Sequence, residues 1–272
     1  MKIGILFGFA LLALAGAGHA QPRDQFDPRE PVVIDPAKSY IFYRTNVRGA
    51  LVLLREAGRG EREAARLAAF NRVRADYERR LAIWERSASR CRSAPAPDCP
   101  ARPQEVTLET FPDPPPERDR YVDIWWQPRF TAGDDGNSYL RAVPPGSYVI
   151  YGNVMIGGGG SMGVCLCMGS LRFEAAAGRI VDLGWIDYRA DPTPGRQPWS
   201  ITVTPYVPTM SLPARLAGLP RIPAEFHAAD KVPNYLGVEI DRHAAMPGVL
   251  AYERDRVIDV RTGRAPAAAD AD

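Results

Sequence analysis

The sequence has almost no net charge, and this shortage argues against one class of function at once. Lys and Arg together number 34 and Asp and Glu together number 32, which leaves a formal net charge of +2. Only three lysines occur, and the arginines that carry nearly all the positive charge are spread along the chain. Because no global field attracts a polyanion, we expect no nucleic-acid partner.

Histidine is also scarce: the chain has three, and only His227 and His243 lie beyond the N-terminal leader. No His-Glu-x-x-His zinc motif occurs, and the glycine run at residues 157–161 lacks the Gly-Lys-Ser/Thr ending of a phosphate-binding loop. We therefore expect the glycine run to form a hairpin loop and both histidines to be structural or exposed. The sequence predicts no catalytic residue, no cofactor and no enzymatic activity.

Long apolar runs are absent after the first 20 residues. Lys2 precedes an apolar stretch at residues 3–18 that is short for a membrane span, and Gly18 and Ala20 are the small side chains that a signal peptidase recognises. We expect a cleaved signal peptide over residues 1–20, a mature chain that is periplasmic or secreted, and no integral membrane span. No cysteine follows the cleavage position, so no lipid anchor is indicated.

Cysteine is limited to four residues, and an oxidising envelope compartment favours disulfides between them. Cys91 and Cys99 are close in sequence, so closing the loop between them costs little entropy, and we predict a disulfide there. Residues i and i+2 of a strand lie about 6.6 to 6.8 Å apart, so a Cys165–Cys167 disulfide requires a bend. The alternative is that Cys165 and Cys167, with Met162 nearby, form a redox pair or bind a soft metal such as Cu(I).

Glycine and proline are abundant, at 24 and 26 residues, and they divide most of the chain into short segments. This frequency of chain-breaking residues excludes a helix bundle. Many of the segments are apolar and rich in β-branched or aromatic side chains, which favours a mainly β fold, an antiparallel β-sandwich. We predict strands at residues 39–44, 51–54, 121–126, 139–143, 147–156, 164–175, 180–188, 200–204, 236–240 and 257–260.

The predicted organisation is a single β-rich domain over residues 37–262. A polar, proline-containing lead-in at residues 21–36 is expected to be extended, and the tail at residues 263–272 is expected to be disordered. Residues 57–120 interrupt the β pattern with a long helix and proline-rich loops.

Residues 61–90 contain neither proline nor glycine, and their apolar side chains recur every three or four positions, which predicts one amphipathic helix. The stripe through Phe70, Tyr77 and Trp84 favours a helix docked on the rest of the fold. The alternative is a helix lying on an anionic membrane, because residues 59–90 carry nine arginines and five acids. Those five acids are local partners for the arginines, and they favour the docked helix.

Two adjacent tryptophans, Trp125 and Trp126, lie in a predicted strand. Neighbouring side chains of a strand point to opposite faces, so one of the pair is a candidate ligand-stacking surface. Packing against the predicted helix explains the pair equally well.

A pattern of turn glycines and apolar residues spans residues 139–186. It runs Pro145-Gly146-x-Tyr148-x-Ile150, then Leu171-x-Phe173, then Gly178-x-Ile180-x-x-Leu183-Gly184. This region resembles the small, prealbumin-like β-sandwich domains of a domain-of-unknown-function group of bacterial envelope proteins and lipoproteins. The resemblance implies a fold and a location and supplies no catalytic residues. The insertion at residues 57–120 departs from the short pattern of that group.

These observations favour a non-enzymatic structural or interaction module of the periplasm or the secreted fraction. Its expected partner is an envelope protein or a cell-wall component. The alternative function is a soft-metal (copper) or thiol-redox module centred on Cys165 and Cys167.

Overall fold

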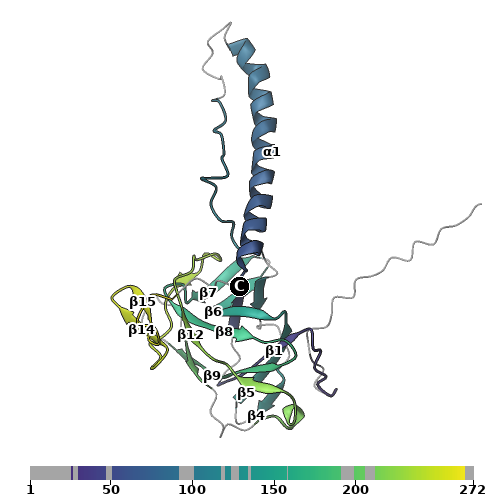
Figure 1. Ribbon diagram of the computed structural model, residues 1–272, viewed down its shortest axis with the longest axis vertical. Helices are drawn as coiled ribbons and strands as arrows, with labels where there is room; N and C mark the ends of the chain where they lie inside the picture. The colour runs from purple at the N-terminus through teal and green to yellow at the C-terminus, as the bar shows by residue number, and fades with distance from the viewer. Residues whose placement is uncertain are drawn as a thin grey trace, which may run out of the picture.

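The protein is mainly β, with several sheets and one long helix (Figure 1). A computed structural model describes residue Phe26 and residues 30–46, 51–91, 101–117, 120–123, 129–133, 136–157, 159–190, 199–205 and 212–266. The predicted signal peptide lies outside these residues. Within them, no helix combines the length and the apolarity needed to cross a membrane.

The first sheet is built around β1, which has β9 on one side and β5 on the other. Its order is β10-β9-β1-β5-β4, and β11 also pairs with β9. The strands are β1 (Ser39–Thr45), β4 (Thr131–Gly133), β5 (Gly136–Val143), β9 (Ile180–Ala190), β10 (Trp199–Thr204) and β11 (Arg221–Pro223).

The second sheet is built around the long strand β6, in the order β12-β8-β6-β2-β3. The first part of β6 pairs with β8 and its second part pairs with β7, which in turn pairs with β13. The strands are β2 (Leu51–Arg55), β3 (Tyr121–Asp123), β6 (Gly146–Gly157), β7 (Gly160–Cys165), β8 (Ser170–Ala175), β12 (His227–Ala229) and β13 (Glu239–Ile240). A separate hairpin joins β14 (Leu250–Glu253) to β15 (Arg256–Asp259).

One apolar core is shared by the two sheets. Ile41 and Tyr43 of β1 lie in the same buried cluster as Leu51 and Leu53 of β2 and Ile150 of β6. These residues alternate along their strands, so each strand turns one row of side chains toward this cluster. The apolar runs that predicted these strands in the sequence therefore supply the core.

The strand pairing is mixed, whereas a purely antiparallel fold was predicted. β1 and β11 both run parallel to β9, and β13 runs parallel to β7. Turn residues in a sequence indicate the relative direction of consecutive strands only. β1 and β9 are not consecutive, because β2 to β8 lie between them in the chain, so no local signal reports that they run parallel. The expected strand at residues 164–175 is also divided, because the chain leaves β7 at Cys165 and enters β8 at Ser170.

A buried ion cluster lies on the first sheet. The carboxylate of Asp182 in β9 has no exposed surface and accepts hydrogen bonds from Arg44 Nη2 at 3.1 and 3.2 Å and from Arg221 Nη1 at 2.8 Å. Its Oδ1 also accepts the backbone N–H of Gly184 at 2.8 Å. Gly184 has a φ of 84°, and it lies where the register of β1 against β9 shifts, so a β-bulge forms beside this carboxylate.

The predicted helix is present as one element, α1 (Arg59–Cys91). Figure 1 shows α1 extending away from the sheets, with residues 101–117 running back beside it. We call α1 and residues 101–117 together the arm. At about 1.5 Å per residue, the 33 residues of α1 span about 50 Å.

The apolar face of α1 packs on residues 101–117, and this corrects the expectation that it docks on the rest of the fold. The Phe70 ring meets the Phe111 ring edge-on at 5.7 Å, and the Arg102 guanidinium lies 5.8 Å from the Trp84 ring centre. Arg66 donates to the carbonyl oxygens of Phe111 and Leu108 at 3.0 and 2.8 Å. Among the described residues, the elements with extensive mutual contact are all strands.

Both ends of the predicted domain differ in detail from expectation. Residues 31–38 form neither helix nor strand, and Val32 is buried in a cluster with Tyr40 and Leu216. Residues 263–266 were expected to be disordered. They form a turn in which Asp259 N–H donates to Arg264 O at 2.8 Å, and Pro266 is buried.

Candidate functional site

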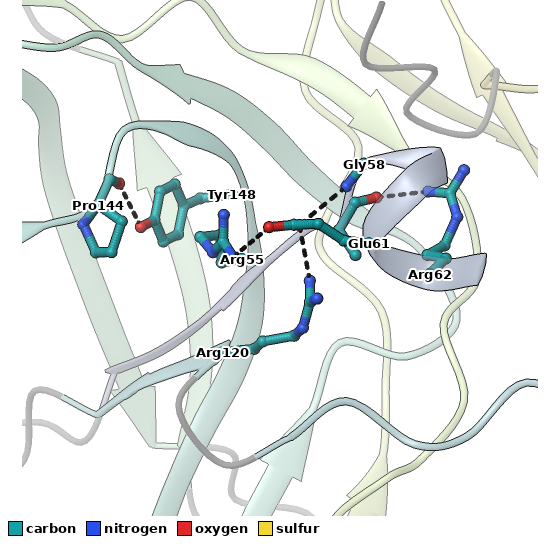
Figure 2. A network of polar contacts seen from close by, with 8 residues as sticks. Arg55, Gly58, Glu61, Arg62, Arg120, Pro144 and Tyr148 are labelled. Atoms are coloured by element: carbon teal, nitrogen blue, oxygen red, sulfur yellow. Dashed lines mark hydrogen bonds and ion pairs between the residues drawn. The ribbon is translucent and has the colours of Figure 1, made fainter. Parts of the chain in front are cut away.

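The base of the arm is held by one carboxylate, that of Glu61 in the first turn of α1 (Figure 2). Arg55, the last residue of β2, donates to Glu61 Oε1 at 3.1 Å. Arg120, one residue before β3, donates to Glu61 Oε2 at 3.5 Å. The backbone N–H of Gly58 donates to Oε2 at 3.2 Å, so the same carboxylate also caps the helix. Glu61 thus joins the strand that enters the arm to the segment that leaves it.

Electrostatics favour the ionised form of Glu61. Partial burial of the carboxylate opposes ionisation, but the hydrogen bonds and charges of Arg55, Gly58 N–H and Arg120 together lower its pKa below the ordinary 4.5. The side chain remains 46% exposed, so solvent screens these interactions. The contacts of Glu61 with Arg55 and Arg120 are therefore contacts between charged groups at neutral pH, and they are accessible to water.

A second carboxylate, that of Glu56, lies directly after β2 and connects three strands. It receives a forked pair of contacts from Arg172 of β8, Nη2 to Oε1 at 2.9 Å and Nε to Oε2, and the Ser147 hydroxyl of β6 donates to Oε2 at 2.8 Å. A forked arginine–carboxylate pair fixes both side chains in one orientation. Glu56, Arg172 and Ser147 therefore form a pre-ordered polar surface on the second sheet.

Glu56 and Glu61 line the same cleft, which has a volume of about 1060 Å³. Its walls come from the end of β2, the first turn of α1, the start of β6, strands β8 and β12, and residues 259–266. This volume is just above the range typical of small-molecule sites, about 300 to 1,000 Å³. The cleft is therefore a candidate binding site.

Cys165 and Cys167 form a disulfide with Cα atoms 5.1 Å apart. β7 ends at Cys165, which supplies the bend that such a bond requires. Both cysteines are buried, and their carbonyl oxygens accept hydrogen bonds from the N–H groups of Asp241 and Val232. The pair therefore lies where residues 232–241 cross the second sheet, in a structural position.

The soft-metal site predicted from Cys165, Cys167 and Met162 is not assembled in this structure. Met162 is 59% exposed, while Cys165 and Cys167 are buried in an apolar cluster with Tyr151 and Val238. Across the part of the chain that the structure describes, no group of three or more His, Cys, Asp or Glu side chains is arranged to hold a metal ion.

Two other predicted features lie wholly or partly outside the described residues. Trp125 and Trp126 fall in the undescribed stretch at residues 124–128, and Cys99 falls in residues 92–100. The stacking surface and the Cys91–Cys99 disulfide stay predictions.

His243 is buried and fully engaged. Its Nε2 accepts the N–H of Val203 at 3.2 Å, and its Nδ1 lies 2.6 Å from Ala244 O, which places the ring proton on Nδ1. Burial lowers the pKa of His243 below the ordinary 6.5, against the opposing effect of the Ala244 hydrogen bond. His227 is half-buried and lines the cleft.

One pattern that sequence reasoning passed over is the Gly-x-Ser-x-Gly at residues 159–163. In hydrolases this pattern places its serine on a sharp turn between a strand and a helix. Here Ser161 lies in β7, opposite Ile156 of β6 in a hairpin, and strand rather than helix follows it. The structure therefore does not place this serine on the strand-to-helix turn of those hydrolases.

Sequence reasoning also missed Glu56 and Glu61. The spacing of Gly58 and Glu61 at the start of a run without proline is that of a capping residue, and it was the available signal for Glu61. Glu56 had no such signal, because Arg172 lies 116 positions away.

The chain matches no protein-family model, no curated protein and no solved structure. Its function is therefore argued from its own geometry.

Proposed function

We propose that this protein is a non-enzymatic interaction module of the bacterial envelope, periplasmic or secreted, in which a β-sandwich body presents the arm to a protein partner. The body is the scaffold and the arm is the contact element. The observation that carries the proposal is the arm itself, which extends away from the sheets and is clamped at its base by Glu61.

The sandwich part of this proposal is supported by the shared core. Residues of β1 and β9 in the first sheet and of β2, β6 and β8 in the second belong to one buried cluster. Two sheets that bury one face each against a common core are the arrangement of a sandwich. Such a body is rigid enough to hold the base of a long helix in a fixed direction.

Two exposed apolar side chains of α1 support a contact role. Residues 101–117 cover Phe70, but Leu67 and Ile83, at two different positions around the helix, are 45% and 54% exposed. Exposed large apolar side chains on a projecting element are suited to burial against another protein.

The charge of the arm favours a protein over a lipid surface. Residues 59–90 carry nine arginines and five acids, but residues 101–117 add four acids and one arginine. The arm is nearly neutral as a unit, and Arg66 of α1 is already paired with Asp113 at 3.8 Å. An anionic membrane attracts a basic face, and here the returning segment largely neutralises it.

The predicted leader and the disulfide support an envelope location. Residues 1–20 have the pattern of a signal peptide, and disulfides persist in oxidising compartments. Mass spectrometry of the exported chain tests this part: a mature N-terminus at Gln21 is expected, and a retained Met1 would contradict it.

Site-specific photo-crosslinking in the native envelope tests the contact role. A photoreactive residue replaces Leu67 or Ile83 in the arm or, as the control, Val260, which is exposed on the body. We expect discrete protein adducts from the two arm positions and none from Val260. Adducts from Val260 alone would contradict the proposal, and retention on purified peptidoglycan without any protein adduct would assign a cell-wall ligand instead.

The alternative, a soft-metal or redox module, rests on Cys165 and Cys167, and the buried disulfide weighs against it. A Cys165→Ala/Cys167→Ala variant separates the two functions. Loss of arm crosslinking in a variant that still folds, or Cu(I) binding by the reduced wild-type protein that this variant lacks, would favour the alternative.

A further inference from the structure

The cleft at the base of the arm has most of its charges already neutralised. Glu56 is held by Arg172, and Glu61 is held by Arg55 and Arg120. The carboxylate of Asp259 accepts the N–H groups of Arg261 and Thr262 and so closes its own turn. These groups shape the walls, but they have little charge left for a ligand.

Two ionised groups of the cleft are different. Glu174 of β8 and Arg264 of the C-terminal turn both line the cleft and are exposed. Neither side chain makes a hydrogen bond or an ion pair with any residue that the structure describes. One free anion and one free cation therefore come from two different walls of a single cavity.

The rest of the lining suits a peptide main chain with small side chains. Ala57 and Ala265, which are not buried, contribute small apolar side chains to the lining, and Thr262 contributes a hydroxyl. Binding sites of this kind bury apolar surface and use a few placed polar groups for orientation. A ligand that satisfies both free charges carries an ammonium group and a carboxylate.

We infer that the cleft binds a short zwitterionic peptide, with the ligand ammonium at Glu174 and the ligand carboxylate at Arg264. This site is distinct from Leu67 and Ile83, the proposed contact positions of the arm, although Glu61 both lines the cleft and holds the base of the arm. Failure of either proposal leaves the other standing.

Titration of the ¹⁵N-labelled protein with alanylalanine tests the inference. We expect shifts in amides of the cleft, such as those of Gly58, Gly146 and Thr262, with a Kd in about the millimolar range. N-acetyl-alanylalanine lacks the ammonium and alanylalanine amide lacks the carboxylate. Each is expected to bind about two- to five-fold more weakly, the range for loss of one exposed ion pair.

Two variants assign each charge. Glu174→Gln is expected to remove the preference for the free ammonium and keep that for the carboxylate, and Arg264→Gln is expected to do the reverse. Glu253→Gln is the matched control, because Glu253 pairs with Arg256 on the β14–β15 hairpin outside the cleft. It should leave both preferences unchanged.

Three results would overturn the inference: no shift in the cleft amides, equal binding of the three peptides, or preferences that survive in both cleft variants. The side chains of Glu174 and Arg264 are exposed and make no hydrogen bond or ion pair with any described residue, so both cleft variants should fold and each outcome is informative.

Discussion

Arg120 Nη1 lies 3.5 Å from Glu61 Oε2, although the two residues are 59 positions apart in the sequence. The contact closes the base of the arm, since Glu61 begins the inserted helix and Arg120 precedes the strand that follows the insertion. The direction of the arm is therefore fixed by a few polar contacts at its base. An element held in this way can be loosened without unfolding the sheets.

Glu61→Gln is expected to loosen the base of the arm. The amide keeps the shape of the side chain but loses its charge for Arg55 and Arg120. Because Glu61 is 46% exposed, the global free energy of unfolding should fall by less than about 1 kcal/mol. Hydrogen exchange at the amide of Arg62, which donates to Gly58 O, should quicken clearly.

The control for this change is Glu78→Gln, which removes an exposed ion pair with Arg74 in the middle of the same helix. It should leave the exchange of the Arg62 amide unchanged. Equal acceleration in both variants would show that Glu61 acts only through the general stability of α1.

Phe70→Ala is expected to separate α1 from residues 101–117. The Phe70 side chain is buried against Phe111, and truncation of a buried aromatic side chain costs about 3 to 5 kcal/mol in a core. The loss should appear as fraying of the arm by far-ultraviolet circular dichroism and hydrogen exchange, with the sheets intact. Ile83→Ala is the control, because Ile83 is 54% exposed and its truncation should change little.

Local pattern explains which parts of this fold were predictable. The helix was found because thirty residues without proline or glycine carry a regular apolar stripe, and the strands β1, β2, β6 and β9 were found from apolar runs between turn residues. The segment that covers the helix could not be predicted, because residues 101–117 show no periodic pattern of apolar side chains. A helix docked on the sheets and a helix covered by such a segment have the same apolar stripe in their sequences.

Pairings between distant residues account for the other failures. β11 and β12 have three residues each, and β11 ends in proline, so neither has a strand pattern of its own. Each forms because a buried strand, β9 or β8, has an open edge beside it. The cleft depends on the same kind of contact, since its walls come from segments that only the fold brings together.

Asp182→Asn is expected to cost about 3 to 5 kcal/mol of unfolding free energy. The substitution keeps the volume but removes the negative charge that Arg44 and Arg221 share in a buried position. Urea unfolding measures the change, and Glu253→Gln in the exposed pair with Arg256 is the control. If both substitutions cost less than about 1 kcal/mol, water must reach the cluster and the pair must behave as a surface ion pair.

The stability of the protein is expected to fall as the pH drops below about 6.5, through His243. Burial lowers the pKa of the folded His243 below its ordinary value of 6.5, so between these two pKa values the unfolded chain binds a proton that the folded chain does not. Stability is therefore complete above the unfolded pKa and is lost with acidification, by at most about 1.4 kcal/mol per pH unit. The structural reason is that a proton on Nε2 would face the Val203 N–H that this nitrogen now accepts.

Urea unfolding at a series of pH values between about 5 and 8 measures this slope. His243→Gln cannot titrate there, so its free energy of unfolding should lose the acid-side slope even if the substitution lowers stability at every pH. His227→Gln, at the half-buried histidine of β12, is the control and should keep the slope of the wild-type protein. An unchanged slope in His243→Gln would place the acid sensitivity elsewhere and would mean that His243 binds its proton as readily in the folded chain as in the unfolded one.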